Sequence, residues 1–166
     1  MAIDSDQFRA TMRHLAGHVC IITTADSDGL RNGLTATAVC SVSAEPPTIL
    51  CCVNKNNGSY DAIVKNGSFV INVLAETDQD LSNRFAGKIF GDERFAEGEW
   101  TTLSTDSPVL ATALASFDCT VAKNVDGGDS HAIFMGEIQA VKAKEGNEQP
   151  LIYAHGSYGT FAADAK

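Results

Sequence analysis

The stretch GLTATAVCSVS, residues 33–43, alternates two kinds of side chain and decides how the surrounding chain folds. Its even positions, from Leu34 to Val42, are apolar, whereas its odd positions are small and, apart from Gly33 and Val39, hydroxylated. A period of two is typical of a β-strand, because successive side chains point to opposite faces of a sheet. We therefore predict one strand across this stretch.

The polar face of this predicted strand is unusual because its side chains are so small. A solvent-facing strand commonly carries Lys, Glu or Arg, whereas this face carries Thr35, Thr37, Ser41 and Ser43. One interpretation is a short exposed edge of a sheet. The other is a platform for a ligand, because small side chains let a flat ring reach the backbone, where hydroxyl and amide groups can hydrogen-bond its polar edge. The periodicity fits both interpretations.

Strands dominate the rest of the chain. Apolar or alternating runs predict further strands at residues 18–25, 48–54, 68–75, 114–125, 131–143 and 150–154. The run Asp126-Gly127-Gly128-Asp129 lies between two of them and is typical of a hairpin turn. Regular alternation of strand and helix is missing, which argues against a doubly wound parallel sheet and favours an antiparallel barrel.

Short helices are predicted between these strands. One covers residues 5–16, with Ser5 as its cap and Gly17 at its end. A second runs from a Ser59 cap to Lys65. A third ends at Gly87 and begins at a capping box formed by Thr77 and Asp80. Residues 88–107 carry no pattern that favours one element.

Composition limits the class of protein. The 166 residues predict a single domain over residues 1–166, and 44% hydrophobic with 20% charged residues excludes a disordered chain. No apolar run is long enough for a membrane helix and no signal peptide is visible, so we expect a cytoplasmic protein with no membrane partner. The formal net charge of −9 argues against nucleic acid as a partner.

No metal site or disulfide framework is expected. The five cysteines include no C-x-x-C pair and lie mostly in apolar runs, where a free thiol packs as a small hydrophobe. His14 and His18 lack the further ligands that a zinc site needs, and no hydrolase triad stands out.

A phosphate site has one candidate in the sequence. No G-x-G-x-x-G or Walker loop occurs, but Lys55 follows a predicted strand and Ser59 opens a predicted helix, whose free N–H groups attract anions. From spacing alone, a solvated lysine and an ordinary helix cap are the favoured interpretation.

Several motifs in a fixed order resemble the short flavin reductase family, the reductase components of two-component flavin monooxygenases, and in particular the 4-hydroxyphenylacetate 3-monooxygenase reductase type. The most specific is GLTATAVCSVSAEPPTILCCVN. The others are FRATMRHLAGHVCIITT, SFVINVLA, LSNRFAG followed by DERF, HAIFMGEI and PLIYAHGSYG. The resemblance covers nearly the whole chain.

The resemblance implies a mainly β fold, an FMN-binding split β-barrel with a few short α-helices, present as a homodimer. It implies an NAD(P)H-dependent flavin reductase that transfers a hydride from NADH or NADPH to FMN, with FAD as the alternative flavin. The reduced flavin would supply a separate monooxygenase component acting on an aromatic compound. No side chain needs to act as an acid or base, because the flavin accepts the hydride.

The resemblance also implies site residues. For the flavin they are Thr35, Ala36, Thr37, Ala38, Ser41, Val42, Ser43, Cys52, Val53, Asn54, Lys55, Ser59, Phe85 and Ala86, with Lys55 and Ser59 at the phosphate. For the nicotinamide dinucleotide they are His131, His155 and Tyr158. Many relatives carry Arg at the position of His155, which leaves the choice between NADH and NADPH open.

Two alternatives use a similar barrel. One is a non-catalytic flavin- or haem-binding protein, which need not admit a dinucleotide. The other is an oxidase of the pyridoxamine-phosphate type, whose arginine-rich phosphate sites are not evident in this sequence.

Overall fold

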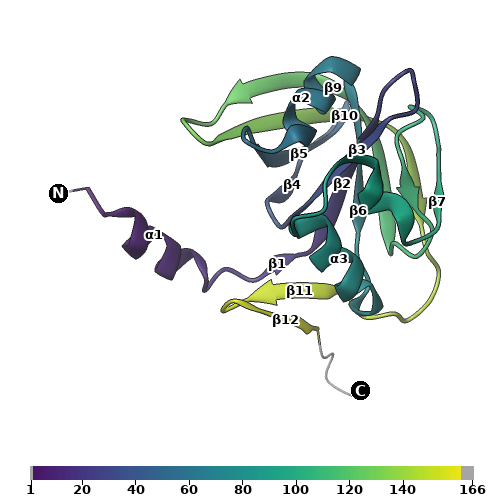
Figure 1. Cartoon of the computed structure of the whole chain (residues 1–166). Coiled ribbons are helices and arrows are strands. Elements are labelled where there is room, and N and C mark those ends of the chain that lie inside the picture. Colours follow the sequence, from purple (N-terminus) through teal and green to yellow (C-terminus); the bar gives the residue numbers. More distant parts are fainter. Residues whose placement is uncertain (1, 162–166) are drawn as a thin grey trace.

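A curled seven-stranded antiparallel sheet forms the body of the protein in the computed structural model, which describes residues 2–161 (Figure 1). Its strands follow the order β3-β2-β6-β9-β10-β5-β4. Their bounds are β2 Cys20–Ala25, β3 Arg31–Ala36, β4 Val39–Ala44, β5 Pro47–Asn54, β6 Ser68–Val73, β9 Ala115–Asp126 and β10 His131–Ala143. The mainly β, antiparallel architecture predicted from the sequence is confirmed.

The two outer strands of this sheet, β3 and β4, are consecutive in the chain. Only Thr37 and Ala38 separate them, so the sheet must curl until its two edges approach each other. The Ala38 carbonyl accepts a hydrogen bond from the Cys52 amide of β5 at 3.0 Å, which ties the connection to the far edge. The result is a barrel that is split where β3 passes into β4.

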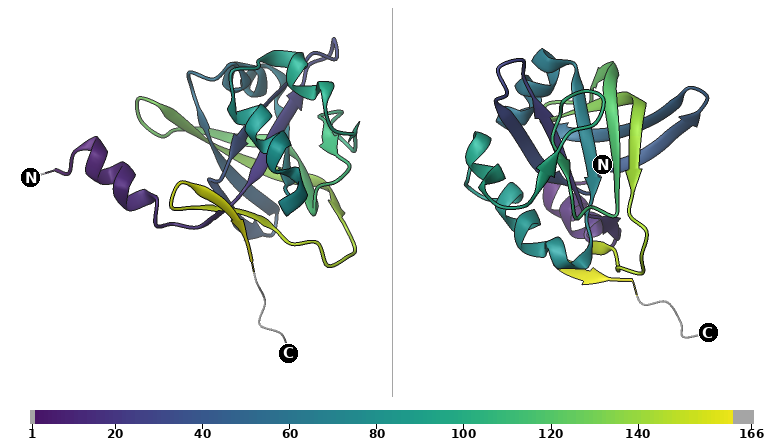
Figure 2. Two further views of the ribbon diagram at one scale, coloured as in Figure 1. Left: turned by 60° about the horizontal axis from the view of Figure 1, so that its bottom comes forward. Right: turned by 90° about the vertical axis from the view of Figure 1, so that its right-hand side faces the viewer.

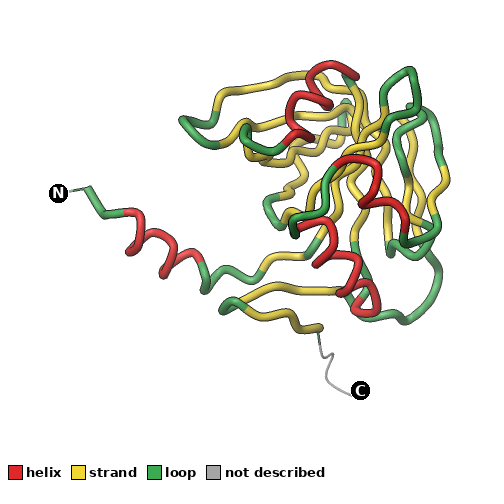
Figure 3. Tube along the Cα trace, viewed as in Figure 1, coloured by secondary structure: helices red, strands yellow, loops and turns green. Residues whose placement is uncertain are grey.

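Smaller elements lie around the barrel, and all of them except the first helix are close to it (Figure 3). A three-stranded sheet has the order β1-β11-β12, and β7 pairs with β8. The bounds are β1 Gly17–His18, β7 Trp100–Thr101, β8 Val109–Leu110, β11 Leu151–Ala154 and β12 Ser157–Thr160. The helices are α1 Ser5–Met12, α2 Gly58–Asn66 and α3 Gln79–Ala86, with 3-10 turns η1 Glu76–Asp78 and η2 Gly91–Ala96. No helix within residues 2–161 is both long and apolar enough to cross a bilayer.

The core has two parts that use opposite faces of the same strands. Cys20 and Ile22 of β2 pack inside the barrel with Phe69 and Phe134. Val19 and Ile21, which alternate with these two residues, point to the outer face of the sheet and pack under α3 and η2. Alternate residues of a strand point to opposite faces, so an apolar run such as β2 is buried on both sides.

The prediction of one continuous strand over residues 33–43 is wrong. The chain bends at Thr37 and Ala38, and the two halves pair with different strands, β2 and β5. The alternation continues through the bend, but β4 has no buried residue, and Val42 is 43% exposed. A local pattern therefore could not show that the two halves lie at opposite edges of one sheet.

Helix boundaries also differ from the predictions. Helix α1 ends at Met12 rather than residue 16, and Asp4 rather than Ser5 forms its capping box with Gln7. Asn57 rather than Ser59 caps α2, because its side chain accepts the Ser59 amide. The predicted Thr77–Asp80 box is absent.

The third helix is instead preceded by a 3-10 turn. The Asp78 carboxylate accepts the amide of Ala75, the residue before η1, at 3.1 Å, and α3 follows the turn directly. The predicted hairpin around residues 126–129 is confirmed by the pairing of β9 with β10. Strand β12 and the short pair β7 and β8 were not predicted.

Helix α1 stands apart from the rest of the molecule (Figures 1 and 2). None of its residues is buried. Phe8, Met12 and the nearby Leu15 share one apolar stripe. Phe8 is 52% exposed, Met12 44% and Leu15 65%. An isolated helix of eight residues is only marginally stable in water, and in this arrangement the apolar stripe of the amphipathic helix α1 stays largely exposed within residues 2–161.

Candidate functional site

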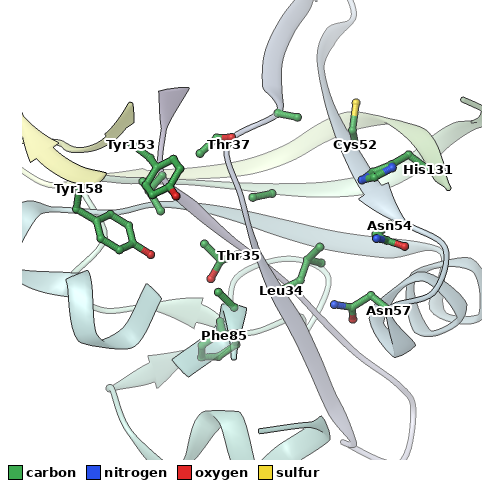
Figure 4. Close-up of a pocket in the computed structure, with 14 residues that line it drawn as sticks. Leu34, Thr35, Thr37, Cys52, Asn54, Asn57, Phe85, His131, Tyr153 and Tyr158 are labelled. Carbon is green, nitrogen blue, oxygen red and sulfur yellow. The ribbon is translucent and has the colours of Figure 1, made fainter. Parts of the chain in front are cut away.

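A cavity of about 460 Å³ opens at the bend between β3 and β4 (Figure 4). This volume lies within the range of about 300–1,000 Å³ that is usual for small-molecule sites. The residues that line it come from the β1–β2 connection, β3 and the bend, β5 and the β5–α2 connection, α3, β10 and the β11–β12 hairpin. They are Val19, Leu34, Thr35, Ala36, Thr37, Ala38, Cys52, Asn54, Asn57, Phe85, Ala86, His131, Tyr153 and Tyr158.

The bend itself forms a wall of backbone with small side chains. Thr37 and Ala38 are both exposed, and the Val39 amide folds back to the Thr37 carbonyl at 3.0 Å. Behind the bend lies Gly17, where a Cβ atom would stand only 2.8 Å from the Thr37 Cβ. Because the residues here are small, Gly17 can pack closely against one side of the bend. On the other side, the backbone of the bend stays accessible.

One hydroxyl of the predicted polar face is already used within the protein. The Thr35 hydroxyl donates to the Ser82 carbonyl at 2.7 Å. The Ser82 hydroxyl lies 2.9 Å from the Tyr158 hydroxyl. Together these bonds fix α3 between β3 and the β11–β12 hairpin, so Thr35 positions the wall of the cavity through its side chain.

Phe85 closes the cavity from the side of α3. Its ring packs edge-on against Phe95 and lies so close to Gly33 that a Cβ atom there would stand 2.8 Å from the Phe85 Cε1 atom. Arg94, only 3% exposed, donates to the Gly33 carbonyl from behind. Burial lowers the pKa of the Arg94 guanidinium. This contact fixes β3 just before the bend.

The opposite wall presents hydrogen-bond donors. The Asn54 side-chain oxygen accepts the Asn56 amide at 2.8 Å, and the Asn57 side-chain oxygen accepts the Ser59 amide at 3.0 Å. Both side-chain NH₂ groups point toward the cavity in Figure 4 and have no hydrogen-bond partner among residues 2–161. Two amide donors thus remain for carbonyl, hydroxyl or phosphate oxygens of a ligand.

The two ends of the cavity carry rings. Tyr153 and Tyr158 of the β11–β12 hairpin lie at one end, with ring centroids 5.3 Å apart in an edge-on arrangement. His131 of β10 lies at the other end, opposite Asn54 in the strand register, and its Nδ1 atom is 2.8 Å from the Ser130 hydroxyl. A planar ligand lying between these ends would meet polar ring edges at both.

Within residues 2–161, no Lys, Arg, Asp or Glu side chain lines the cavity. The nearest lysine in the sequence, Lys55, directly follows Asn54 but its Nζ atom lies 2.6 Å from the Asp126 carboxylate. Among residues 2–161, no group of three or more His, Cys, Asp or Glu side chains is placed to hold a metal ion. The cavity therefore suits a ligand whose ring system is neutral.

Ten of the residues implied by the resemblance lie together in this cavity. They are Thr35, Ala36, Thr37, Ala38, Cys52, Asn54, Phe85, Ala86, His131 and Tyr158. Val19, Leu34, Asn57 and Tyr153 also line it and were not predicted. Asn57 carried a signal, because an asparagine before Gly58 is a common helix cap. Val19 and Leu34 look like ordinary core residues in the sequence.

Seven implied residues lie elsewhere in the single chain. Ser41, Val42 and Ser43 are exposed on β4, the Val53 side chain is buried in the barrel, and Ser59 is buried at the start of α2. His155 lies in the β11–β12 turn with φ at 53°, and its ring stacks edge-on against His14 at 4.9 Å. Lys55 is the seventh, held outside the lining by Asp126.

Comparisons with known proteins point to one family. The family described as "Flavin reductase like domain" matches residues 12–162. A curated protein of Pseudomonas syringae pv. syringae, named FMN reductase (NADH) RutF, is 43% identical over 152 residues, which are 92% of this chain and 84% of that protein.

Two solved structures extend the comparison. Nitrilotriacetate monooxygenase component B from Mycobacterium thermoresistibile is 31% identical with a TM-score of 0.89, over 96% of this chain and 87% of that one. Flavin reductase PheA2 is 31% identical with a TM-score of 0.86, over 97% of this chain and 100% of that one.

We predict that the five free cysteines will separate into two groups in a thiol-labelling experiment. Cys40 is exposed and Cys52 half-buried in the cavity wall, so both should react in the native protein. Burial raises the pKa of the Cys20 and Cys119 thiols to about 12 and that of Cys51 still further. Because the thiolate is the reactive form, these three should react only after unfolding.

The measurement is tandem mass spectrometry of tryptic peptides after labelling at pH 8, with and without denaturant, because Cys40, Cys51 and Cys52 share the peptide of residues 32–55 and must be distinguished by fragmentation. Fast native labelling of any of the three buried thiols would contradict this packing.

Proposed function

The chain belongs to the flavin reductase family, and from this premise we propose that the protein is an NADH-dependent FMN reductase. The observation that carries the proposal is the cavity at the bend, where accessible backbone and small side chains face two free amide donors and no charge. Such a site fits a flat, uncharged ring with polar edges, which describes the isoalloxazine of a flavin. When bound, the flavin supplies the chemistry by accepting a hydride from NADH.

The chain's own residues bind and orient the two ring systems. In this proposal the backbone of residues 35–38 holds the flavin edge. Cys52 and Asn54 of the neighbouring strand β5 line the cavity, and Phe85 closes it from the side of α3. Tyr158 and His131 border the cavity from two directions and would meet an entering nicotinamide. Holding two reacting rings in place replaces a bimolecular encounter, which accounts for catalysis without an acid or base residue.

FMN and NADH are the pair that we favour. The Pseudomonas syringae relative carries both in its name. FAD remains the alternative flavin, since an adenylate could extend beyond the cavity, and NADPH remains the alternative donor.

We further propose that reduced flavin leaves the site and serves a separate monooxygenase component. The relative from Mycobacterium thermoresistibile supports this role, because its name makes it component B of a monooxygenase. That name refers to nitrilotriacetate, which has no aromatic ring, so the aromatic substrate expected from the sequence stays a prediction. A cytoplasmic location fits the five free thiols, because a reducing compartment keeps cysteines unpaired.

We also propose that the protein is a homodimer in which α1 packs against a second copy. A groove of about 550 Å³ separates α1 from the body, and its lining includes Phe8, Met12 and Tyr153 together with Thr37 and Ala38 of the bend. A second copy seated there would cover the apolar stripe and complete the site from its open side. The residues of the bend would then lie near the subunit boundary.

The proposed activity predicts NADH oxidation that depends on added FMN. We expect turnover on the order of 10 per second, the median for enzymes, and one NADH consumed for each FMN reduced when oxygen is excluded. The measurement is NADH absorbance in the presence and absence of FMN, repeated with FAD and with NADPH. FMN binding without NADH oxidation would instead favour a non-catalytic flavin carrier.

The proposed dimer predicts that polar substitutions on the α1 stripe will separate the subunits. The double variant Phe8→Ser/Met12→Ser should be monomeric, because burying each of these side chains stabilises by about 1.5–3 kcal/mol. Light scattering after size-exclusion chromatography gives the mass. Ala10→Ser, on the opposite side of the same helix, serves as the control and should remain dimeric. A monomeric wild-type protein would rule out the dimer.

A further inference from the structure

The ion pair between Lys55 and Asp126 lies beside the cavity but outside its lining. The Lys55 Nζ atom is 2.6 Å from the Asp126 Oδ1 atom, although the two residues are 71 positions apart. The lysine side chain is 26% exposed and the aspartate side chain 75% exposed. Solvent reaches both groups, so the pair can open at low cost.

The backbone holds both partners in place. The Lys55 amide donates to the Ser130 carbonyl at 2.9 Å, and Lys55 follows Asn54, which lines the cavity. Asp126 begins the turn between β9 and β10, where its Oδ1 atom also accepts the Gly128 amide at 3.1 Å. The carboxylate is therefore fixed by the hairpin, whereas the lysine ends in a flexible four-carbon chain.

The carboxylate stays ionised under the conditions in which the enzyme would work. The hydrogen bond from Lys55 and the amide of Gly128 lower the pKa of Asp126. At neutral pH a full negative charge therefore faces the ammonium group. Any second anion that approaches Lys55 meets this charge.

A flavin phosphate is such an anion. FMN differs from riboflavin by a phosphate group, and the part of the chain that the structure describes places no Lys or Arg in the cavity lining to receive it. Lys55 is the cation whose backbone adjoins the donor wall formed by Asn54 and Asn57. To bind a phosphate it must leave Asp126 or share its charge between two anions.

We propose that Asp126 is a specificity-determining residue that competes with the flavin phosphate for Lys55. The inference rests on the proposed function and deepens it. The competition weakens the binding of FMN but leaves that of riboflavin unchanged, because riboflavin does not engage the lysine. It suits a reductase whose reduced flavin must leave for another protein.

The test is a titration of the full-length protein with FMN and with riboflavin, followed by flavin fluorescence. Asp126→Asn keeps the shape of the side chain and removes the competing charge. We expect it to tighten FMN binding by about two- to fivefold, the range set by an exposed ion pair worth up to about 1 kcal/mol. Riboflavin affinity should stay the same.

Two further variants separate competition from other effects. Asp129→Asn removes a charge from the same turn, and Asp129 has no hydrogen bond or ion pair within residues 2–161. The FMN affinity of the Asp129→Asn variant should match that of the wild type, and this match would exclude a general effect of net charge on FMN binding. In the Lys55→Ala background, Asp126→Asn should give no gain, because the shared partner is gone.

The outcomes are distinguishable. Equal tightening for FMN and riboflavin, an unchanged FMN affinity, or the same gain without Lys55 would each overturn the role of Asp126 while leaving the reductase intact. A wild-type protein that binds neither flavin would overturn the proposed function and this inference with it.

Discussion

The two-residue connection between β3 and β4 is the constraint on which the rest of the structure depends. Thr37 and Ala38 must carry the chain from one edge of a seven-stranded sheet to the other. So short a link forces the sheet to curl, and the bond from the Cys52 amide to the Ala38 carbonyl fixes the closure. The same link remains at the surface, because its neighbours on the open side are a helix that stands apart and a hairpin of two strands.

The small residues near this link are needed for more than one structural reason. Gly17 and Gly33 are small because Thr37 and Phe85 pack directly against them. The Thr35 hydroxyl is engaged with α3. Thr37 and Ala38 are exposed, and although their carbonyls accept the Val39 and Cys52 amides, their own amides have no hydrogen-bond partner within residues 2–161. The residues that form one uniform polar face in the sequence therefore have two roles. Thr35 positions the walls of the cavity, whereas the backbone of the bend is available to a ligand.

Much of the fold could be predicted from the sequence because its signals are local. The hairpin between β9 and β10 follows from its glycine turn, and the antiparallel class follows from the missing alternation of strand and helix. The bend escaped prediction because the alternation continues through it, while the change of pairing partner depends on distant strands. The pairing of Lys55 with Asp126 is likewise a contact between remote segments, and no spacing could have shown it.

Ten residues that the resemblance implied line one cavity, and chemical patterns alone would not have grouped them. Cys52, Asn54 and His131 carry no motif of their own, and only the fold brings them to one cavity. Asn57 and Tyr153 were missed because a helix cap and a strand tyrosine are ordinary features of any barrel. Their position in the wall follows from the β5–α2 connection and the β11–β12 hairpin, whose placement depends on tertiary packing.

The most direct test of the central claim is a crystal structure of the protein with FMN. The account predicts that the isoalloxazine lies in the cavity, with its polar edge hydrogen-bonded to backbone groups between residues 35 and 38 and one face open to solvent. Density for the ring at another place, or a bend covered by side chains with the flavin excluded, would contradict it.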